Sequence, residues 1–295
     1  MNGQQKAIPA HLAPRCHRLG DLAVWMLTDG VFDPNPSYFG TGAETPEHAH
    51  LFRAGAGELT ELPVGCFLIA GIAGRLILVD AGLGPDPTAL SHGGYSRYSR
   101  HGSLVGGQLL SQLEATGYRP EQVTDVVITH LHNDHHGWLT HSDEGTFPQA
   151  RLWVGTDEWD FSLHHPDSLM PGYARRRLAA VADRGQLELL TGGAIAPGVT
   201  ALYTPGHTPG SLTVDVRGGS QRLLLLGDAV TCPIQHAHPD WHSVGDRDVE
   251  LADRSRATLW RELSRPATRG LGSHFPRLHA GSIGGAPPRW QGPES

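Results

Sequence analysis

Four histidines and one aspartate lie within seven residues near the middle of the chain, in the segment HLHNDHH at 130–136. The segment follows the apolar run 126–128, which predicts a buried strand that ends where the histidines begin. Imidazole and carboxylate groups are ligands that divalent transition metals accept readily. The same groups would be costly to bury in an apolar core. The segment therefore predicts a metal site at the end of a strand.

Three further segments offer a histidine or an aspartate beside a predicted strand or helix. They are TPGHTPGS at 204–211 with His207, LGDA at 226–229 with Asp228, and GSHFP at 272–276 with His274. Taken singly, each has an ordinary explanation, such as a surface histidine or an aspartate that caps a turn. Together with the first segment they share one arrangement, in which ligands sit on loops that a rigid sheet positions. Five histidines and two aspartates suffice for two divalent ions and leave positions for solvent and substrate.

The hydrophobic pattern indicates which elements must position these side chains. The predicted strands are 22–27, 65–70, 75–79, 123–129, 151–154, 187–190, 199–203, 211–216 and 222–226. The predicted helices are 46–54, 103–116, 157–163, 173–183 and 248–263. Residues 1–19 are expected to form an irregular arm, and the sequence TDG at 28–30 is expected to stop the first strand. A series of strands followed by a helix occurs twice, which predicts a layered α/β fold.

Composition limits the classes of partner. The 295-residue chain has a formal net charge of −7, which argues against a nucleic-acid-binding surface or a polybasic membrane patch. We therefore expect a small-molecule substrate. The cysteines Cys16, Cys66 and Cys232 are far apart and odd in number, which argues against a disulfide framework. With no apolar leader over 1–14 and no apolar run approaching ~20 residues, the expected location is the cytoplasm.

The order of the motifs resembles that of the metallo-β-lactamase superfamily. The matching segments are LVDAG at 78–82, HxHxDH at 130–135, TPGH at 204–207, GD at 227–228 and SHFP at 273–276. The resemblance extends from about residue 20 to 280. It implies a four-layer αβ/βα sandwich of two mixed β-sheets with helices outside and the site at one edge of the sheets. Because no interdomain linker is evident, we expect residues 1–295 to form one domain.

The resemblance also implies a role for each ligand. His130, His132 and His207 would hold one ion, Asp134, His135 and His274 would hold the other, and Asp228 would bridge them. Asp80 would accept a hydrogen bond from a ligand imidazole, His136 would face solvent or stand behind the ligands, and Gly137 would let the backbone pass closely. Zinc is the expected ion, and iron, manganese or cobalt also suit this ligand set.

A hydrolytic mechanism follows from the same resemblance. A hydroxide that bridges the two ions would attack a carbonyl carbon or a phosphorus atom. Asp134 and Asp228 are the predicted catalytic residues, with Asp134 orienting the nucleophile and returning a proton to the leaving group. His132 stands where diiron flavoproteins carry an acidic residue, and Asp228 stands where many β-lactamases carry cysteine or serine. Both observations favour hydrolysis other than that of β-lactam antibiotics.

The substrate is expected to be a lactone or a carboxylic ester. The N-terminal part and the strand ending in LVDAG look most like the branch that holds quorum-quenching N-acyl-homoserine lactonases and methyl-parathion-type hydrolases. An organophosphate triester, an aryl ester or a thioester is the alternative substrate, and a metal-binding scaffold is the non-enzymatic alternative. Relatives suggest a homodimer.

The pocket wall is less well defined by the sequence. Small lactonases carry a tyrosine three residues after the bridging aspartate, where this chain has Thr231. Tyr95, Tyr98 or Tyr173 could replace that tyrosine, and Trp138 is the first candidate for the wall because it adjoins the ligands. Further candidates are Phe32, Phe39, Phe161 and Trp241 for the wall and His236, His238 and His242 for the mouth. The loops 33–60 and 85–102 are expected to face the substrate.

Overall fold

Strand β3 (Leu62–Ile72) carries apolar side chains on both faces, which is the pattern of a strand in the middle of a covered sheet. The computed structural model describes residues 12–53, 57–85 and 101–292. In it, Phe67 and Ile69 contribute to one hydrophobic core, whereas Leu68 and Ala70 contribute to another. β3 therefore separates two apolar layers.

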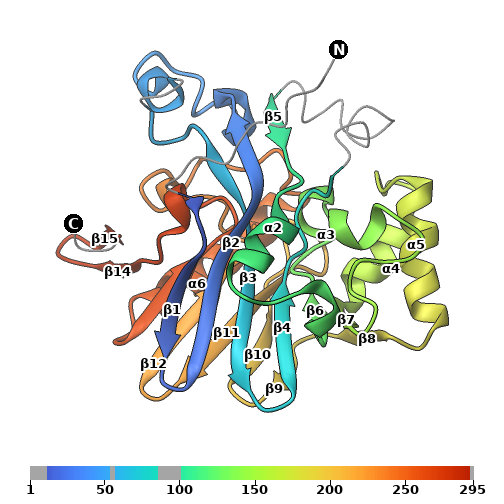
Figure 1. Cartoon of the computed structure of the whole chain (residues 1–295). Helices are drawn as coiled ribbons and strands as arrows, with labels where there is room; N and C mark the ends of the chain where they lie inside the picture. The colour runs from blue at the N-terminus through green and yellow to red at the C-terminus, as the bar shows by residue number, and fades with distance from the viewer. Residues whose placement is uncertain (1–11, 54–56, 86–100, 293–295) are drawn as a thin grey trace.

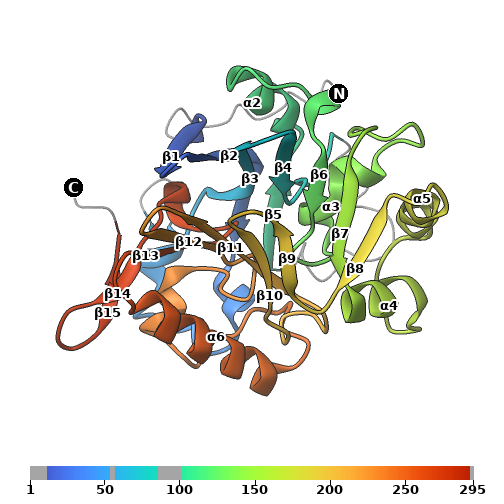
Figure 2. The same cartoon turned by 90° about the horizontal axis from the view of Figure 1, so that it is seen from below.

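Two sheets lie face to face around the first of these cores (Figures 1 and 2). The eight-stranded sheet contains β1 (Arg15–Leu19), β2 (Leu22–Pro34), β3, β4 (Arg75–Val79), β6 (Asp125–Val127), β7 (Arg151–Gly155) and β8 (Leu187–Leu190) in that order, with β5 (Gly102–Val105) paired to β2. The five-stranded sheet has the order β13 (Thr268–Leu271), β12 (Gln221–Leu225), β11 (Leu212–Gly218), β10 (Val199–Tyr203) and β9 (Gly193–Ala196). A separate ladder joins β14 (Ser282–Gly284) to β15 (Arg289–Gln291).

Helices cover the outer face of each sheet. They are α2 (Leu109–Ala115), α3 (Asn133–Thr140), α4 (Thr156–His164) and α5 (Gly172–Asp183) on the eight-stranded sheet, and α6 (Val249–Leu263) on the five-stranded sheet. Figure 2 shows the two sheets between α2 and α6. Both sheets combine parallel and antiparallel strand pairs. The pair β4–β6 is parallel in the eight-stranded sheet, and the pair β12–β13 is parallel at the edge of the five-stranded sheet. The predicted four-layer sandwich is confirmed.

Three predictions about the N-terminal half are wrong. Residues 15–19 form β1 instead of an irregular arm, because alternating half-exposed side chains suit an edge strand without an apolar run. The sequence TDG at 28–30 does not stop β2 but shifts its register on β3, as a β-bulge does. The predicted helix 103–116 begins only at Leu109, because residues 102–105 pair with β2 as strand β5.

Other elements differ in length or were not predicted. The segment 33–60 holds the last residues of β2 and two short 3-10 helices, η2 (Pro36–Phe39) and η3 (Ala49–Phe52), instead of a helix over 46–54. Besides β1 and β5, the unpredicted α-helix and strands of the described chain are α3, β9, β13, β14 and β15. Most of the loop 85–102, with Tyr95 and Tyr98, lies outside the described residues. None of the described helices combines the length and the apolar character that crossing a bilayer requires.

Candidate metal centre

The ligand side chains predicted from the sequence all come from the same edge of the two sheets. His130 follows the end of β6, Asp228 follows the end of β12, and His274 follows the end of β13. His207 lies on the turn between β10 and β11. His132 is the extended residue at the start of α3, whose first turn carries Asp134 and His135. Neighbouring strand ends therefore bring together residues that are far apart in the sequence.

Seven side chains converge into one cluster, which we call the seven-residue cluster: His130, His132, Asp134, His135, His207, Asp228 and His274. Three groups of three within it have ligand atoms within 4.8 Å of one another: His130, His132 and His207; His130, His135 and Asp228; and Asp134, His135 and His274. The first and third groups are the two ligand trios predicted from the sequence. Asp228 lies between them, with its carboxylate 3.8 Å from His207 Nε2 and 3.5 Å from His274 Nε2.

Most of the ring nitrogens that face away from the cluster have a partner. His135 Nδ1 donates to Asp80 Oδ2 at 2.8 Å, and His274 Nδ1 donates to the carbonyl of Pro63 at 2.8 Å. Asp80 itself accepts from the backbone N–H and the hydroxyl of Thr129 at 2.8 and 2.9 Å. Such hydrogen bonds orient an imidazole and fix which of its nitrogens is free to bind a metal. The side chains are therefore held with an Nε2 or Nδ1 atom toward the centre of the cluster.

Burial and mutual repulsion keep two of the imidazoles neutral. Burial, followed by the neighbouring imidazoles, lowers the pKa of His132 to about 3 and that of His130 well below its ordinary value. On His135, burial acts in the same direction, but the carboxylates of Asp80, Asp134 and Asp228 outweigh it and raise its pKa to about 9. Asp228 has a lowered pKa despite its burial, because His274 and His135 are close. The carboxylates of the cluster are thus ionised and attract cations.

Two buried polar atoms of the cluster lack a hydrogen-bond partner within the described part of the chain. They are His135 Nε2 and Asp228 Oδ1, which lie 3.7 Å apart. Buried polar atoms are rarely left unpaired, and a bound ion would satisfy both. A set of five imidazoles and two carboxylates also matches the ligands that zinc and similar divalent ions accept. The residues present therefore fit a metal site.

Gly137 lets the backbone of α3 pass close to residues 82–84. A Cβ at this position would lie 1.9 Å from the carbonyl oxygen of Leu83, and the Gly137 N–H donates to the carbonyl of Gly82 at 2.6 Å. Only glycine allows this approach.

Two residues adjoining the cluster are buried. His136 is fully buried, so of its two predicted places the solvent-facing one is wrong, and its Nδ1 pairs with Thr140 Oγ1 at 3.1 Å. Trp138 belongs to the core between the eight-stranded sheet and its helices, and its Nε1 donates to Asp29 Oδ1 at 2.7 Å. Thr231 is also fully buried, with its backbone N–H bonded to Gln235. Trp138 is therefore a core residue whose polar atom has a partner, and it does not line the pocket beside His132 and His207.

Most of the other predicted pocket residues lie in hydrophobic clusters. Phe32, Phe39 and Trp241 belong to one hydrophobic cluster, and the ring centroid of Phe32 lies 5.2 Å from that of His274. Tyr173 packs on the core beneath α5, and His238 stacks on Trp241. His236 packs on Trp260, and His242 pairs with Asp253. Of this set only Phe161 lines the pocket beside the cluster.

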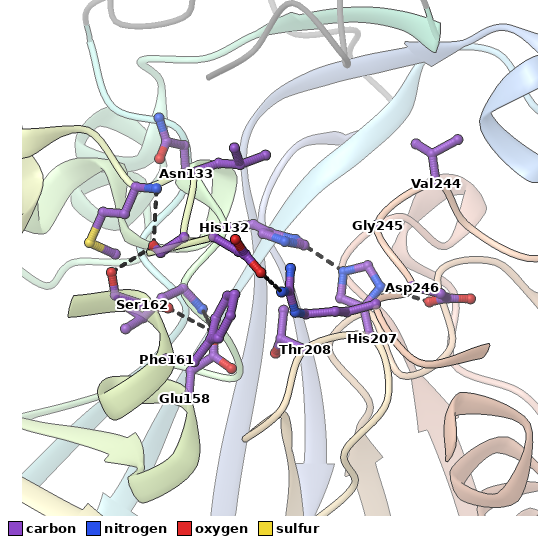
Figure 3. A pocket seen from close by; sticks show the side chains of 16 residues that line it. His132, Asn133, Glu158, Phe161, Ser162, His207, Thr208, Val244, Gly245 and Asp246 are labelled. Carbon is purple, nitrogen blue, oxygen red and sulfur yellow. Dashed lines mark hydrogen bonds and ion pairs between the residues drawn. The ribbon is translucent and has the colours of Figure 1, made fainter. Parts of the chain in front are cut away.

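That pocket has a volume of about 440 Å³ and opens beside His132 and His207. Its walls come from residues 131–133, helix α4, residues 167–170, residues 207–208 and residues 244–247. Figure 3 shows His132 and His207 near each other on this wall, where His207 Nε2 lies 3.1 Å from His132 Nδ1. Of the predicted loop 33–60, the residues that the structure describes (33–53 and 57–60) do not line it. The pocket thus reaches two members of the first trio, His132 and His207.

Three carboxylates that hold the site were not predicted from the sequence. Asp246 accepts from His207 Nδ1 at 2.9 Å. Glu158, in α4, accepts from the N–H groups of Leu131 and Gly210, at 2.7 and 3.3 Å. Asp29, at the bulge of β2, accepts from the backbone of Leu83 at 2.8 Å and from Trp138. Each binds residues distant in sequence, so no local motif reveals its role.

Comparisons with known proteins agree with this geometry. The sequence profile of the metallo-beta-lactamase superfamily matches residues 59–269. The chain is 30% identical over 187 residues to the N-acyl homoserine lactonase AiiA of Bacillus thuringiensis subsp. kurstaki, which covers 59% of this chain and 67% of that protein. Among solved structures, it resembles AidC, a dizinc quorum-quenching lactonase, with a TM-score of 0.78 and 25% identity over 96% of this chain and 98% of that one.

A second solved structure supports the fold. The hydrolase AbOPH of the beta lactamase superfamily has a TM-score of 0.75 and 23% identity, over 95% of this chain and 96% of that one. The profile match spans more than half of the chain and includes every residue of the seven-residue cluster except His274. The chain belongs to the metallo-β-lactamase superfamily, and it is a metal-dependent hydrolase.

Proposed function

We propose that this protein is a dinuclear lactonase that opens the ring of a lactone bearing an acyl chain, with zinc as its ion. The observation that carries the proposal is the convergence of two complete ligand trios, with the carboxylate of Asp228 between them. A scaffold protein would not require all seven donor side chains together. The similarity to AiiA and AidC, which are lactonases, supports the choice of substrate.

The carboxylates and the histidines of the cluster have different roles in the proposed reaction. The seven-residue cluster would hold two divalent ions, which when bound would supply Lewis acidity toward a carbonyl oxygen and lower the pKa of a bound water. Asp134 and Asp228 are the carboxylates that border this region, and we assign Asp134 to orient the attacking water. His135, His207 and His274 are fixed by their outward nitrogens before substrate arrives, so little reorganisation of these rings would accompany the reaction.

The pocket suits a substrate with one polar and one apolar end. His132 and His207 form its inner wall, beside the cluster. The pocket is also lined by the apolar side chains of Leu131, Phe161 and Met170, which can contact an acyl chain. Such contacts contribute roughly 0.8 kcal/mol for each buried methylene group. A lactone ring would therefore lie at the cluster with its acyl chain along this wall.

A substrate panel tests the proposal. Wild-type protein loaded with zinc is assayed with N-acyl-homoserine lactones of several chain lengths, an aryl ester, a phosphotriester and a thioester. We expect lactone opening, its loss on removal of zinc by a chelator, and its recovery on adding zinc back. Asp228→Ala should abolish it, whereas Glu250→Ala, which removes an exposed carboxylate from α6, should not. Turnover of another ester with every lactone inert would show that the substrate class is wrong.

A further inference from the structure

Carboxylates stand behind two of the five imidazoles, one in each ligand trio. Asp80 accepts from His135 Nδ1 at 2.8 Å. Asp246 accepts from His207 Nδ1 at 2.9 Å, and Figure 3 shows this pair. The two carboxylates are held differently. Asp80 is bound by the neutral Thr129 hydroxyl and backbone, whereas Asp246 is bound by an arginine. The first trio is therefore linked to α6 through the ion pair between Asp246 and Arg256.

The side chain of Asp246 is inaccessible to solvent, and each of its oxygens has a donor. Oδ1 accepts from His207 Nδ1, and Oδ2 accepts from the backbone N–H of Ser243 at 3.1 Å and from Nη2 of Arg256. Arg256 lies in α6 and is itself 5% exposed. A buried carboxylate is costly unless it is paired and hydrogen-bonded, and Arg256 meets that need. The carboxylate therefore has one orientation relative to His207.

Arg256 also reaches the other side of the site. Its Nε donates to the carbonyl of Ala229 at 3.1 Å, and Ala229 is the residue after Asp228. One guanidinium thus connects the carboxylate behind His207 to the backbone that carries Asp228. These contacts join residues from a turn, a loop, a helix and a strand end. They set the position of two ligands relative to one another.

Helix α6 and the residues just before it fix the backbone of the turn that carries His207. The N–H of Arg247 donates to the carbonyls of Gly206 and His207, both at 3.1 Å, and Ser255 Oγ donates to the carbonyl of Pro205 at 2.6 Å. Gly206 lies so close to α6 that a Cβ on it would be 2.1 Å from the backbone nitrogen of Ala252. The helix therefore holds both the main chain and the side chain of His207.

We propose that Asp246 and Arg256 are positioning residues for His207, with Asp246 holding its Nδ1–H and Arg256 holding Asp246 in register with Asp228. The proposal rests on the dinuclear centre proposed above. An imidazole that donates Nδ1–H to a carboxylate presents Nε2 to a metal and is a more basic ligand. Loss of the carboxylate should free the ring to rotate and to exchange tautomers. Its effect should fall on the first trio and spare the second.

Two measurements test the proposal. The first is imidazole ¹⁵N NMR of the metal-free protein, in which we expect His207 to show the Nδ1–H tautomer in the wild type and a mixture of tautomers in Asp246→Asn. The second is a Co²⁺ titration followed by the visible spectrum. In Asp246→Asn, the affinity for one of two ions should fall ~10–100-fold, the range for such outer partners, while the other ion binds as before. The visible spectrum of the Co²⁺ ion that binds more weakly should also change.

Arg256 variants and a matched control separate positioning from general destabilisation. Arg256→Met should weaken the same ion, and Arg256→Lys, which keeps the charge, should restore part of the affinity. Asp215→Asn is the control, because it removes a buried carboxylate that pairs with Arg222 in the five-stranded sheet, away from the cluster. It should lower the melting temperature without altering the Co²⁺ spectrum.

The outcomes of the two proposals can be told apart. If the wild type binds no Co²⁺, the dinuclear centre is wrong, and the NMR measurement alone decides the orientation of His207. If the wild type binds two ions and both Asp246→Asn and Arg256→Met bind them with the same affinities and spectra, only the positioning role is wrong. An unchanged His207 tautomer in Asp246→Asn would likewise overturn it.

Discussion

Gly245 lies in contact with the imidazole of His207. A Cβ at this position would be 2.5 Å from Cε1 of His207 and 3.3 Å from Cε1 of His132. Real Cβ atoms do not approach other atoms this closely, so a methyl group would displace one or both rings. We therefore predict that Gly245→Ala binds zinc more weakly and loses most of its activity, although the fold is retained. Zinc titration and circular dichroism check this, and an unchanged zinc affinity would contradict it.

Glu158 holds two ligand segments with one carboxylate. Its oxygens accept from the N–H of Leu131, between two ligand histidines, and from the N–H of Gly210, on the turn after His207. Burial raises the pKa of Glu158, and the hydrogen bonds from Thr208, Leu131 and Gly210 oppose that effect. Glu158→Ala leaves both backbone groups without this acceptor, which should cost about 2–4 kcal/mol of unfolding free energy.

Glu158→Gln is the matched variant, because its amide oxygen can still accept one of the two hydrogen bonds. It should lose less stability than Glu158→Ala and keep measurable zinc binding. Urea unfolding of the metal-free variants gives the comparison. Equal stability of the wild type and Glu158→Ala would show that this carboxylate does not hold the two segments.

The members of the seven-residue cluster could be predicted from the sequence because each lies just beyond a strand, on a turn or at the start of a helix. The spacing of His130, His132 and Asp134 is itself informative, and the strands then bring His207 and His274 to the same edge. The layers could be predicted for a similar reason, since buried strands are apolar on both faces.

The supporting residues could not be predicted, because their roles depend on contacts across the fold. Asp29 stands in a sequence typical of a turn, yet it lies at a bulge and accepts hydrogen bonds from three segments. Trp138 was expected on the pocket wall because it adjoins the ligands. Its position on α3 turns it into the core, where Asp29 accepts its N–H. Asp246 and Arg256 carry no local signal.

The pocket predicts a dependence on acyl chain length. Phe161 lines the outer wall, where Arg247 covers its ring at 4.1 Å and pairs with Asp167 at 3.4 Å. Phe161→Ala removes apolar contact of roughly 1.5 kcal/mol, so kcat/KM for a long-chain lactone should fall about tenfold. A lactone without an acyl chain should be nearly unaffected. An equal loss for both substrates would place the acyl chain elsewhere.

The ion pair between Arg75 and Asp125 predicts how the free energy of unfolding falls in acid. Arg75 donates to both oxygens of Asp125, at 2.9 and 2.5 Å, and to the carbonyl of Ile195, so it joins the two sheets. Burial alone would raise the pKa of Asp125, but hydrogen bonds from Arg75, Thr124 and Trp153 hold it below its ordinary value of 3.8. A lowered pKa in the folded state means that the stabilisation is present above that ordinary value.

The stabilisation by Asp125 should therefore be lost as the pH falls below about 4 and through the lowered pKa of the folded state. Asp125→Asn should be less stable than the wild type at neutral pH, and the difference should shrink in acid. Urea unfolding of both proteins at several pH values measures it. A difference that stays constant down to the acid limit would contradict the assigned shift.

The metal content of the purified protein tests the central claim most directly. Elemental analysis of wild-type protein, prepared with zinc and freed of unbound ions, should give about two ions per chain. Asp228→Ala should retain fewer, and Glu250→Ala should match the wild type. Lactone opening should rise and fall with the bound zinc. A wild-type chain that holds no zinc, cannot acquire it, and is folded would contradict the assignment of the seven-residue cluster as a metal centre.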